Sequence, residues 1–130
     1  MKKPDAAAQT AILRDFALAL PGAWEDHPWG DRVVKVGKKI FVFLGSETPS
    51  EERADQVGMC VKLPESVDEA LSLPGTEPAG YGLGKAGWVN MWFAPEHEVP
   101  VDLMCDWIEE SYRAVAPKKL IKQLEAERAD

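Results

Sequence analysis

The sequence predicts a single α+β domain in which an antiparallel β-sheet is flanked by N- and C-terminal helices, in α-β-α order. Three observations support this prediction. The length of 130 residues is typical of one domain. Apolar residues recur at helical spacing near both ends and form short β-branched and aromatic runs between them. Short connections join those runs and favour antiparallel pairing, and no linker or repeat divides residues 1–130.

The N-terminal part is expected to form one helix and then three strands. The helix covers residues 6–19, with Asp5 as its cap, and ends before Pro21-Gly22. Its apolar face recurs at three- and four-residue spacing and consists of Ile12, Leu13, Phe16 and Leu20. The expected strands are 23–26, 32–36 and 40–44, with a turn at 27–31 and a hairpin turn at Gly37-Lys38-Lys39.

The middle of the chain is expected to hold one strand and one short helix. The strand covers residues 56–63 and ends at a proline. The helix lies near residues 67–73 and begins at a capping box formed by Ser66 and Glu69. Residues 74–86 are rich in glycine and proline, which predicts a loop with one short strand.

The last strand and the final helices follow from the C-terminal part. The strand over residues 88–93 places alternate side chains on one face, namely Trp88, Asn90 and Trp92. Pro100 suits the first turn of a long helix. The apolar stripe of that helix consists of Leu103, Met104, Trp107, Ile108 and Val115. A terminal helix is expected over residues 117–124.

Charge and composition indicate an intracellular binding protein. The net charge of −7 argues against a generic nucleic-acid binder. Residues 1–45 nevertheless hold seven Lys/Arg against five Asp/Glu, whereas residues 46–130 hold eight against seventeen, so a local basic face is possible. No apolar segment is long enough for a membrane span or a signal core. We therefore expect a cytoplasmic protein with no membrane partner, and free thiols in the core at Cys60 and Cys105.

Candidate catalytic and metal-binding residues are few. His27 and His97 are the two imidazoles, and neither accompanies a nucleophile motif such as GxSxG. A metal site would have to join Asp26, His27, Glu96 and His97, whose spacing matches no standard ligand motif. We therefore predict that the protein is not an enzyme and that it carries no metal or cofactor.

The glycine-rich segment over residues 80–87, GYGLGKAG, is interpreted as a hairpin-like connection. A phosphate-binding loop needs a lysine followed by serine or threonine, and a dinucleotide fingerprint opens a helix. This segment instead leads into the strand over residues 88–93. Its glycines then serve positive φ angles or close backbone approach.

Cations gather on the two hairpin-like connections. The predicted phosphate contacts are Arg32, Lys35, Lys38 and Lys39 on the first hairpin and Lys85 on the second connection. Two loops that carry cations can hold a phosphate backbone between them. The alternative is that these lysines are ordinary turn residues and gatekeepers of an edge strand.

Several motifs resemble the MmcQ/YjbR family, in the same order along the chain. The resemblance runs from about Ile12 to Leu124. Its N-terminal motifs are Pro21-Gly22-Ala23, Trp29-Gly30, the segment 36–41 and Lys62-Leu63-Pro64. Its C-terminal motifs are the segments 80–85 (GYGLGK), 87–89 (GWV) and 107–113 (WIEESYR). In that family, polar residues recur at the positions that match Lys62, Lys85, Ser111 and Tyr112, with Trp29 and Trp88 beside them.

The resemblance implies a CyaY-like α+β fold and a DNA-binding role, with the β-hairpins as a double wing. It brings no catalytic residues. The alternative function is a small-ligand or protein-binding module, whose cleft would be rimmed by Trp29, Lys62, Lys85, Trp88 and Tyr112. Tyr112 has an alternative of its own, in which its ring packs internally and its hydroxyl is hydrogen-bonded. A frataxin-like metal binder is the third possibility. The expected partners are therefore DNA, a small anionic ligand or a protein, and the expected state is a monomer or weak homodimer.

Overall fold

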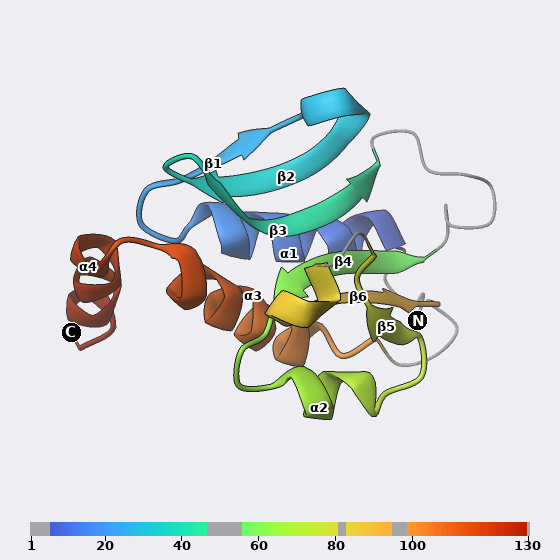
Figure 1. Cartoon of the computed structure of the whole chain (residues 1–130). Helices are drawn as coiled ribbons and strands as arrows, with labels where there is room; N and C mark the ends of the chain where they lie inside the picture. Colours follow the sequence, from blue (N-terminus) through green and yellow to red (C-terminus); the bar gives the residue numbers. More distant parts are fainter. Residues whose placement is uncertain (1–5, 47–55, 81–82, 95–98, 130) are drawn as a thin grey trace.

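The computed structural model describes residues 6–46, 56–80, 83–94 and 99–129, and Figure 1 shows the chain. The helices are α1 (Ala6–Leu18), α2 (Val67–Leu71), α3 (Val101–Val115) and α4 (Lys118–Ala129), with short 3-10 helices η1 (Pro28–Gly30) and η2 (Leu83–Ala86). The strands are β1 (Ala23–Asp26), β2 (Asp31–Val36), β3 (Lys39–Ser46), β4 (Val57–Lys62), β5 (Thr76–Pro78) and β6 (Trp88–Phe93).

The strands form one six-stranded sheet in the order β1-β2-β3-β4-β6-β5, and every neighbouring pair is antiparallel. Helices α1 and α3 contact each other and pack on the same face of this sheet (Figure 1). The predicted α+β fold with flanking helices is therefore confirmed. We call the opposite face, which carries no α-helix among the described residues, the outer face.

Alternation along β4 and β6 separates the two faces of the sheet. Val57, Met59 and Val61 are buried under the helices, whereas the residues between them are half-buried. In β6, Val89 and Met91 are fully buried, and Trp88, Asn90 and Trp92 lie on the outer face, as predicted. Burial of apolar side chains between the helices and the inner face of the sheet, opposite the outer face, is the main contribution to the stability of the fold.

A bulge in β3 changes how its side chains point. Val34 pairs with Val42, but Lys35 pairs with Ile40, so Phe41 is an extra residue. Phe41 and Val42 are therefore both fully buried although they are adjacent in the sequence. The Phe41 ring lies edge-on to the ring of Tyr112, with 5.3 Å between ring centroids.

Ser111 on α3 bridges β3 and β4 where their pairing ends. Only Val42–Val61 and Phe43–Cys60 are paired between these strands. Beyond them, the Ser111 hydroxyl accepts a hydrogen bond from the Lys62 N–H at 2.9 Å and donates one to the Phe41 carbonyl. The buried Ser111 side chain thus continues the ladder that the bulge interrupts.

Tyr112 ties α3 to the end of α1. Its side chain is fully buried, and its hydroxyl donates a hydrogen bond of 2.6 Å to the Pro21 carbonyl. Burial raises the pKa of the Tyr112 hydroxyl above its ordinary value, so the group is a donor at neutral pH.

The substitution Tyr112→Phe is expected to lower the free energy of unfolding by about 1–2 kcal/mol, because it leaves the Pro21 carbonyl without this donor. Urea denaturation followed by circular dichroism measures the change. An unaltered midpoint would show that the hydrogen bond contributes nothing to stability.

Four local predictions were wrong. Ile12, predicted on the apolar face of the first helix, is 50% exposed, and Cys60, predicted in the core, is half-buried on the outer face. Ser66 does not cap α2 with its own side chain, because its hydroxyl donates to Glu110 of α3 at 2.6 Å. The same carboxylate accepts the backbone N–H groups of Glu65 and Ser66, so α3 supplies the cap. The terminal helix is also longer than predicted, since α4 continues to Ala129. Glu109 of α3 pairs with Arg128 of α4, which holds the added turns in place.

The segment 80–87 connects two paired strands, as expected for a hairpin-like connection. The Ala79 N–H bonds to the Trp88 carbonyl at 3.0 Å, and η2 lies within the connection. Gly87 has a φ of +91°, and its carbonyl accepts a hydrogen bond from the Leu63 N–H at 2.8 Å. A glycine here lets the connection come close to the backbone just after β4. No helix in the described parts of the chain is long and apolar enough to cross a membrane.

Candidate functional site

The turns of two hairpins lie at one end of the sheet. Strands β2 and β3 are joined at Gly37-Lys38, and β5 and β6 are joined by the connection that contains η2. Strand β4 lies between these hairpins in the sheet order. It ends at Lys62, which pairs with Trp88 at the start of β6. The sheet topology therefore brings three chain segments that are far apart in the sequence to the same end of the strands.

Each of these segments carries lysine at this end. Lys38 and Lys39 are exposed at the first turn, Lys62 is half-buried at the end of β4, and Lys85 is exposed on η2. The two hairpins and β4 thus present four amines without help from any other element.

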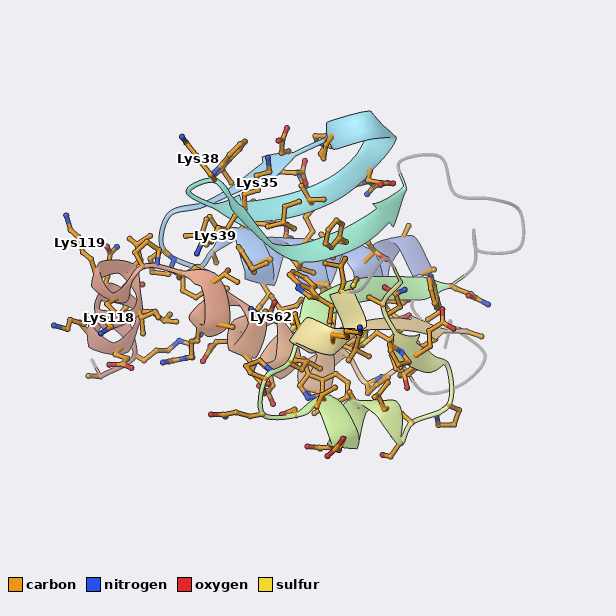
Figure 2. The ribbon with its side chains drawn as sticks, viewed as in Figure 1. Lys35, Lys38, Lys39, Lys62, Lys118 and Lys119 are labelled. Carbon is orange, nitrogen blue, oxygen red and sulfur yellow. The ribbon has the colours of Figure 1, made fainter. Side chains whose placement is uncertain are left out.

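Helix α4 adds two lysines to the same end. Leu120 packs on Gly22, so closely that a Cβ on that glycine would lie 2.8 Å from the leucine Cδ1. The next residue, Ala23, pairs with Val36 beside the hairpin turn. The first turn of α4, with exposed Lys118 and Lys119, therefore lies at the same end of the protein as the hairpin turn with Lys38 and Lys39, to one side of it (Figure 2). We call Lys38, Lys39, Lys62, Lys85, Lys118 and Lys119 the lysine end.

Ion pairing distinguishes the lysine end from Lys35, Arg14 and Arg113, whereas Arg32 and Lys122 also form no ion pair within the described residues. Lys35 pairs with Asp26 at 2.7 Å, and Arg14 pairs with Glu25. Arg113 pairs with Glu109 at 3.2 Å and with Glu125 at 3.0 Å. In the described parts of the chain, by contrast, no lysine of the lysine end takes part in an ion pair. Their charge therefore remains available to an external anion.

The pairs near β1 also keep their carboxylates ionised. The hydrogen bond from Lys35 lowers the pKa of Asp26 below its ordinary value, and the hydrogen bond from Arg14 does the same for Glu25. The charge of Lys35 is thus largely offset within the protein.

The five predicted phosphate contacts are not brought to one place. Lys38, Lys39 and Lys85 belong to the lysine end. Lys35 is held by Asp26 and lies over the Trp24 ring, 5.2 Å from its centroid. Arg32 lies near the start of β2, at the opposite end of the strand from the turn. Lys118 and Lys119 were absent from the prediction, since nothing local in the sequence indicates where α4 docks.

The predicted ligand cleft is corrected by the burial of Tyr112. Its ring lies in the core, so it cannot rim an open cleft, and the internal alternative describes it instead. Lys62, Lys85 and Trp88 do lie at one end of the sheet and adjoin the lysine end. The side chain of Trp29 lies outside what the structure describes.

Two of the four residues that a metal site would have to join lie among the described residues. The His27 ring nitrogen lies 2.8 Å from a Glu25 carboxylate oxygen, and Asp26 bonds Lys35. Glu96 and His97 lie outside the described residues. Within the described residues, no group of three or more histidine, cysteine or acidic side chains is placed to hold a metal ion.

Aromatic side chains cover the outer face next to the lysine end. Phe43 of β3 and Trp88 of β6 meet edge-to-face, with centroids 5.7 Å apart and an interplanar angle of 73°. Both rings are half-buried. Cys60 lies in the row between Phe43 and Asn90, and burial raises the pKa of its thiol to about 12, so it is protonated at neutral pH. The continuous apolar run over residues 40–44 did not indicate which face Phe43 occupies, because the bulge at Phe41 decides it.

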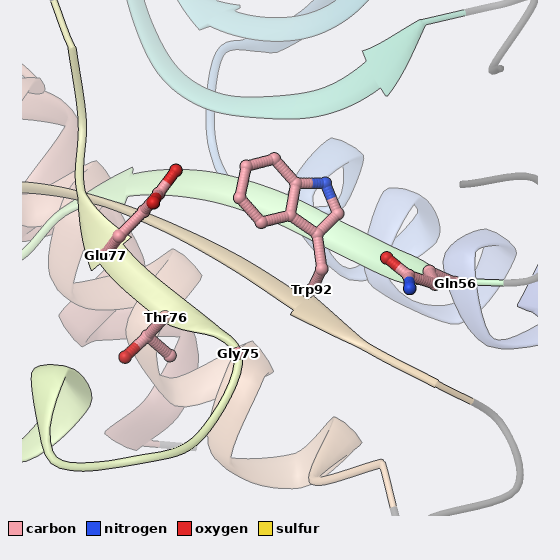
Figure 3. Close-up of a pocket in the computed structure, with 5 residues that line it drawn as sticks. All are labelled: Gln56, Gly75, Thr76, Glu77 and Trp92. Atoms are coloured by element: carbon pink, nitrogen blue, oxygen red, sulfur yellow. The ribbon is translucent and has the colours of Figure 1, made fainter. Parts of the chain in front are cut away.

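Trp92 occupies the far part of the outer face. Its indole lies over Gly58 of β4, where a Cβ would come within 2.6 Å of the ring. Figure 3 shows the ring reaching from β6 across β4, between Gln56 and Glu77. These residues, with Gly75 and Thr76, line a small pocket of about 290 Å³. Glu77 is exposed, so this part of the face is less favourable to phosphate than the lysine end.

Comparisons with known proteins agree with the predicted family. A family model described as YjbR matches residues 18–114. A solved structure from Deinococcus radiodurans, a protein with a DUF419 domain, is similar with a TM-score of 0.63 and 25% sequence identity. The alignment covers 87% of this chain and 85% of that one. No curated protein matches significantly. Because the family model spans most of the chain, including both hairpins and α3, the protein belongs to the YjbR family.

Proposed function

We propose that this protein binds DNA without catalysing a reaction on it, through phosphate contacts made by the lysine end. The observation that carries the proposal is that four chain segments place six lysines at one end of the protein, none ion-paired within the described residues. Lysine is a flexible point charge that suits phosphate contacts.

The two hairpins supply a geometric argument for the same role. Their turns flank the end of β4, so Lys38 and Lys85 stand on either side of Lys62. A backbone that crosses this end of the sheet would meet cations from both hairpins and from β4. This arrangement supports a double-wing contact, in which phosphates fix the position of the nucleic acid without reading its sequence.

The net charge of −7 is compatible with this local mode of binding. Exposed charges separated by more than about 8–10 Å are largely screened at physiological salt, so distant acidic residues weaken the lysine end little. They instead disfavour contacts elsewhere on the surface. Binding should therefore be confined to one end of the protein and should depend strongly on salt.

The first expected result concerns this salt dependence. Fluorescence anisotropy of a labelled DNA duplex should show affinity falling by about a thousandfold between about 50 and 200 mM salt if all six lysines contact phosphates. Replacing Lys38 and Lys39 with glutamine should reduce the slope of log K against log salt by about 1.8, or 0.9 for each lost contact.

A matched pair of charge reversals tests the location. Lys38→Glu and Arg32→Glu change the net charge equally and lie at opposite ends of the β2–β3 hairpin. Lys38→Glu should weaken binding about tenfold at low salt, whereas Arg32→Glu should change it by less than about twofold. Equal effects would place the contacts elsewhere, and absence of binding at 50 mM salt would refute the proposed function.

A further inference from the structure

The outer face carries its aromatic residues directly beside the lysine end. Trp88 is the register partner of Lys62, so the indole and the butyl-ammonium chain lie side by side on adjacent strands. Phe43 of β3 meets the Trp88 ring across the intervening strand β4, and η2 places Lys85 three residues before Trp88. Stacking surface and cations are thus provided within one patch.

Such a patch is of little use to a duplex. In double-stranded DNA the flat faces of the bases are hidden by stacking, and only their edges and the phosphates are accessible. A single strand exposes both a phosphate and a base face in each nucleotide. Aromatic side chains on an open sheet, with lysines that follow the backbone, are the groups that hold such strands.

The electrostatics of the outer face give this contact a direction. Lys62 and Lys85 lie at the Trp88 end of β6, whereas exposed Glu77 lies beside Trp92 near the other end of the strand. Trp88 and Trp92 are four residues apart, or about 13 Å along the strand. Phosphate is therefore favoured near Trp88 and disfavoured near Trp92.

Resting on the proposed function, we infer that the preferred ligand is single-stranded nucleic acid, with one base stacked on Trp88, whose ring Phe43 supports edge-to-face, while the adjacent phosphates contact Lys62 and Lys85. The remaining lysines, Lys38, Lys39, Lys118 and Lys119, extend the track for the backbone beyond this base. The contact is sequence-tolerant, because every base has an aromatic face.

The experiment compares three labelled ligands with the whole protein at about 50 mM salt. They are a single-stranded thymidine oligomer of about ten nucleotides, the duplex that it forms with a complementary adenosine oligomer, and an abasic oligomer of equal length. The thymidine oligomer should bind at least five-fold more tightly than the other two, since stacking is worth that much or more per base. Trp88→Leu should remove this advantage, and Trp88→Phe should retain most of it.

The controls separate failure of this inference from failure of the proposed function. Ile12→Ala removes an exposed apolar side chain from α1, away from the outer face, and should leave every affinity unchanged. Thermal unfolding confirms that each variant is folded, and the abasic comparison needs no variant. Equal binding of all three ligands would overturn the stacking inference and leave phosphate binding intact. Absence of binding to any of them would overturn both.

Discussion

Gly75→Ala is expected to lower the free energy of unfolding by more than about 3 kcal/mol, the largest effect among the substitutions considered. Gly75 has a φ of +85°, which costs an L-residue about 1–2 kcal/mol. A Cβ at this position would also lie 2.3 Å from the Trp92 carbonyl oxygen. Backbone must shift to relieve that contact, and the shift would break the 2.8 Å hydrogen bond from the Trp92 N–H to the Gly75 carbonyl.

Gly45→Ala is the matched control for this effect. Gly45 has a φ of +91°, but nothing lies within 4 Å of the position of its Cβ. It should therefore show the conformational cost alone, about 1 kcal/mol. Urea denaturation of both variants gives the comparison. Equal losses would mean that the close approach of Trp92 to Gly75 is absent in solution.

Ser111→Ala is expected to cost about 2–3 kcal/mol of stability. The change leaves the Lys62 N–H and the Phe41 carbonyl without their shared partner, in the interior where water cannot replace it. The cost of two unsatisfied groups exceeds that of one ordinary hydrogen bond. Because the bulge at Phe41 prevents direct pairing at this point, β3 and β4 should separate locally.

Amide hydrogen exchange by NMR distinguishes this local effect from general destabilisation. Under conditions where the protein stays folded, protection at the Lys62 amide should fall more than at Val61 or Val89. Ser72→Ala is the control, since its hydroxyl donates to the Glu69 carbonyl on the surface, and it should change stability by less than about 0.5 kcal/mol. Unchanged protection at Lys62 would show that Ser111 does not bridge the strands.

Ser111 also links the core to the candidate interface. It holds the backbone of Lys62, whose side chain belongs to the lysine end and lies beside Trp88. Tyr112, the next residue, donates a hydrogen bond to the Pro21 carbonyl, and Leu120 of α4 packs against the adjacent Gly22. Two adjacent residues on α3 thus position β4 and the segment on which α4 docks. Ser111 and Tyr112 therefore position the backbone from inside the core, and neither side chain is placed to contact a ligand.

Sequence patterns of short range were reliable for individual elements. Alternation in residues 88–93 correctly placed Trp88 and Trp92 on one face, because a strand repeats every two residues whatever its neighbours are. Apolar spacing correctly placed Met104, Trp107 and Ile108 on the buried side of α3 for the same kind of reason. The capping box at Ser66 failed because a partner distant in the sequence, Glu110, competes for the same hydroxyl.

The amino-acid sequence by itself determined the α+β class, the succession of helices and strands, and the family, because these depend on local period and on motifs in order. Only the tertiary structure decided which cations lie at one end of the protein. The lysine end exists because β4 lies between two hairpins and because α4 folds back onto Gly22. Both depend on contacts between segments far apart in the sequence. The same long-range packing buried Tyr112, paired Lys35 with Asp26 and left Arg32 at the other end of its strand.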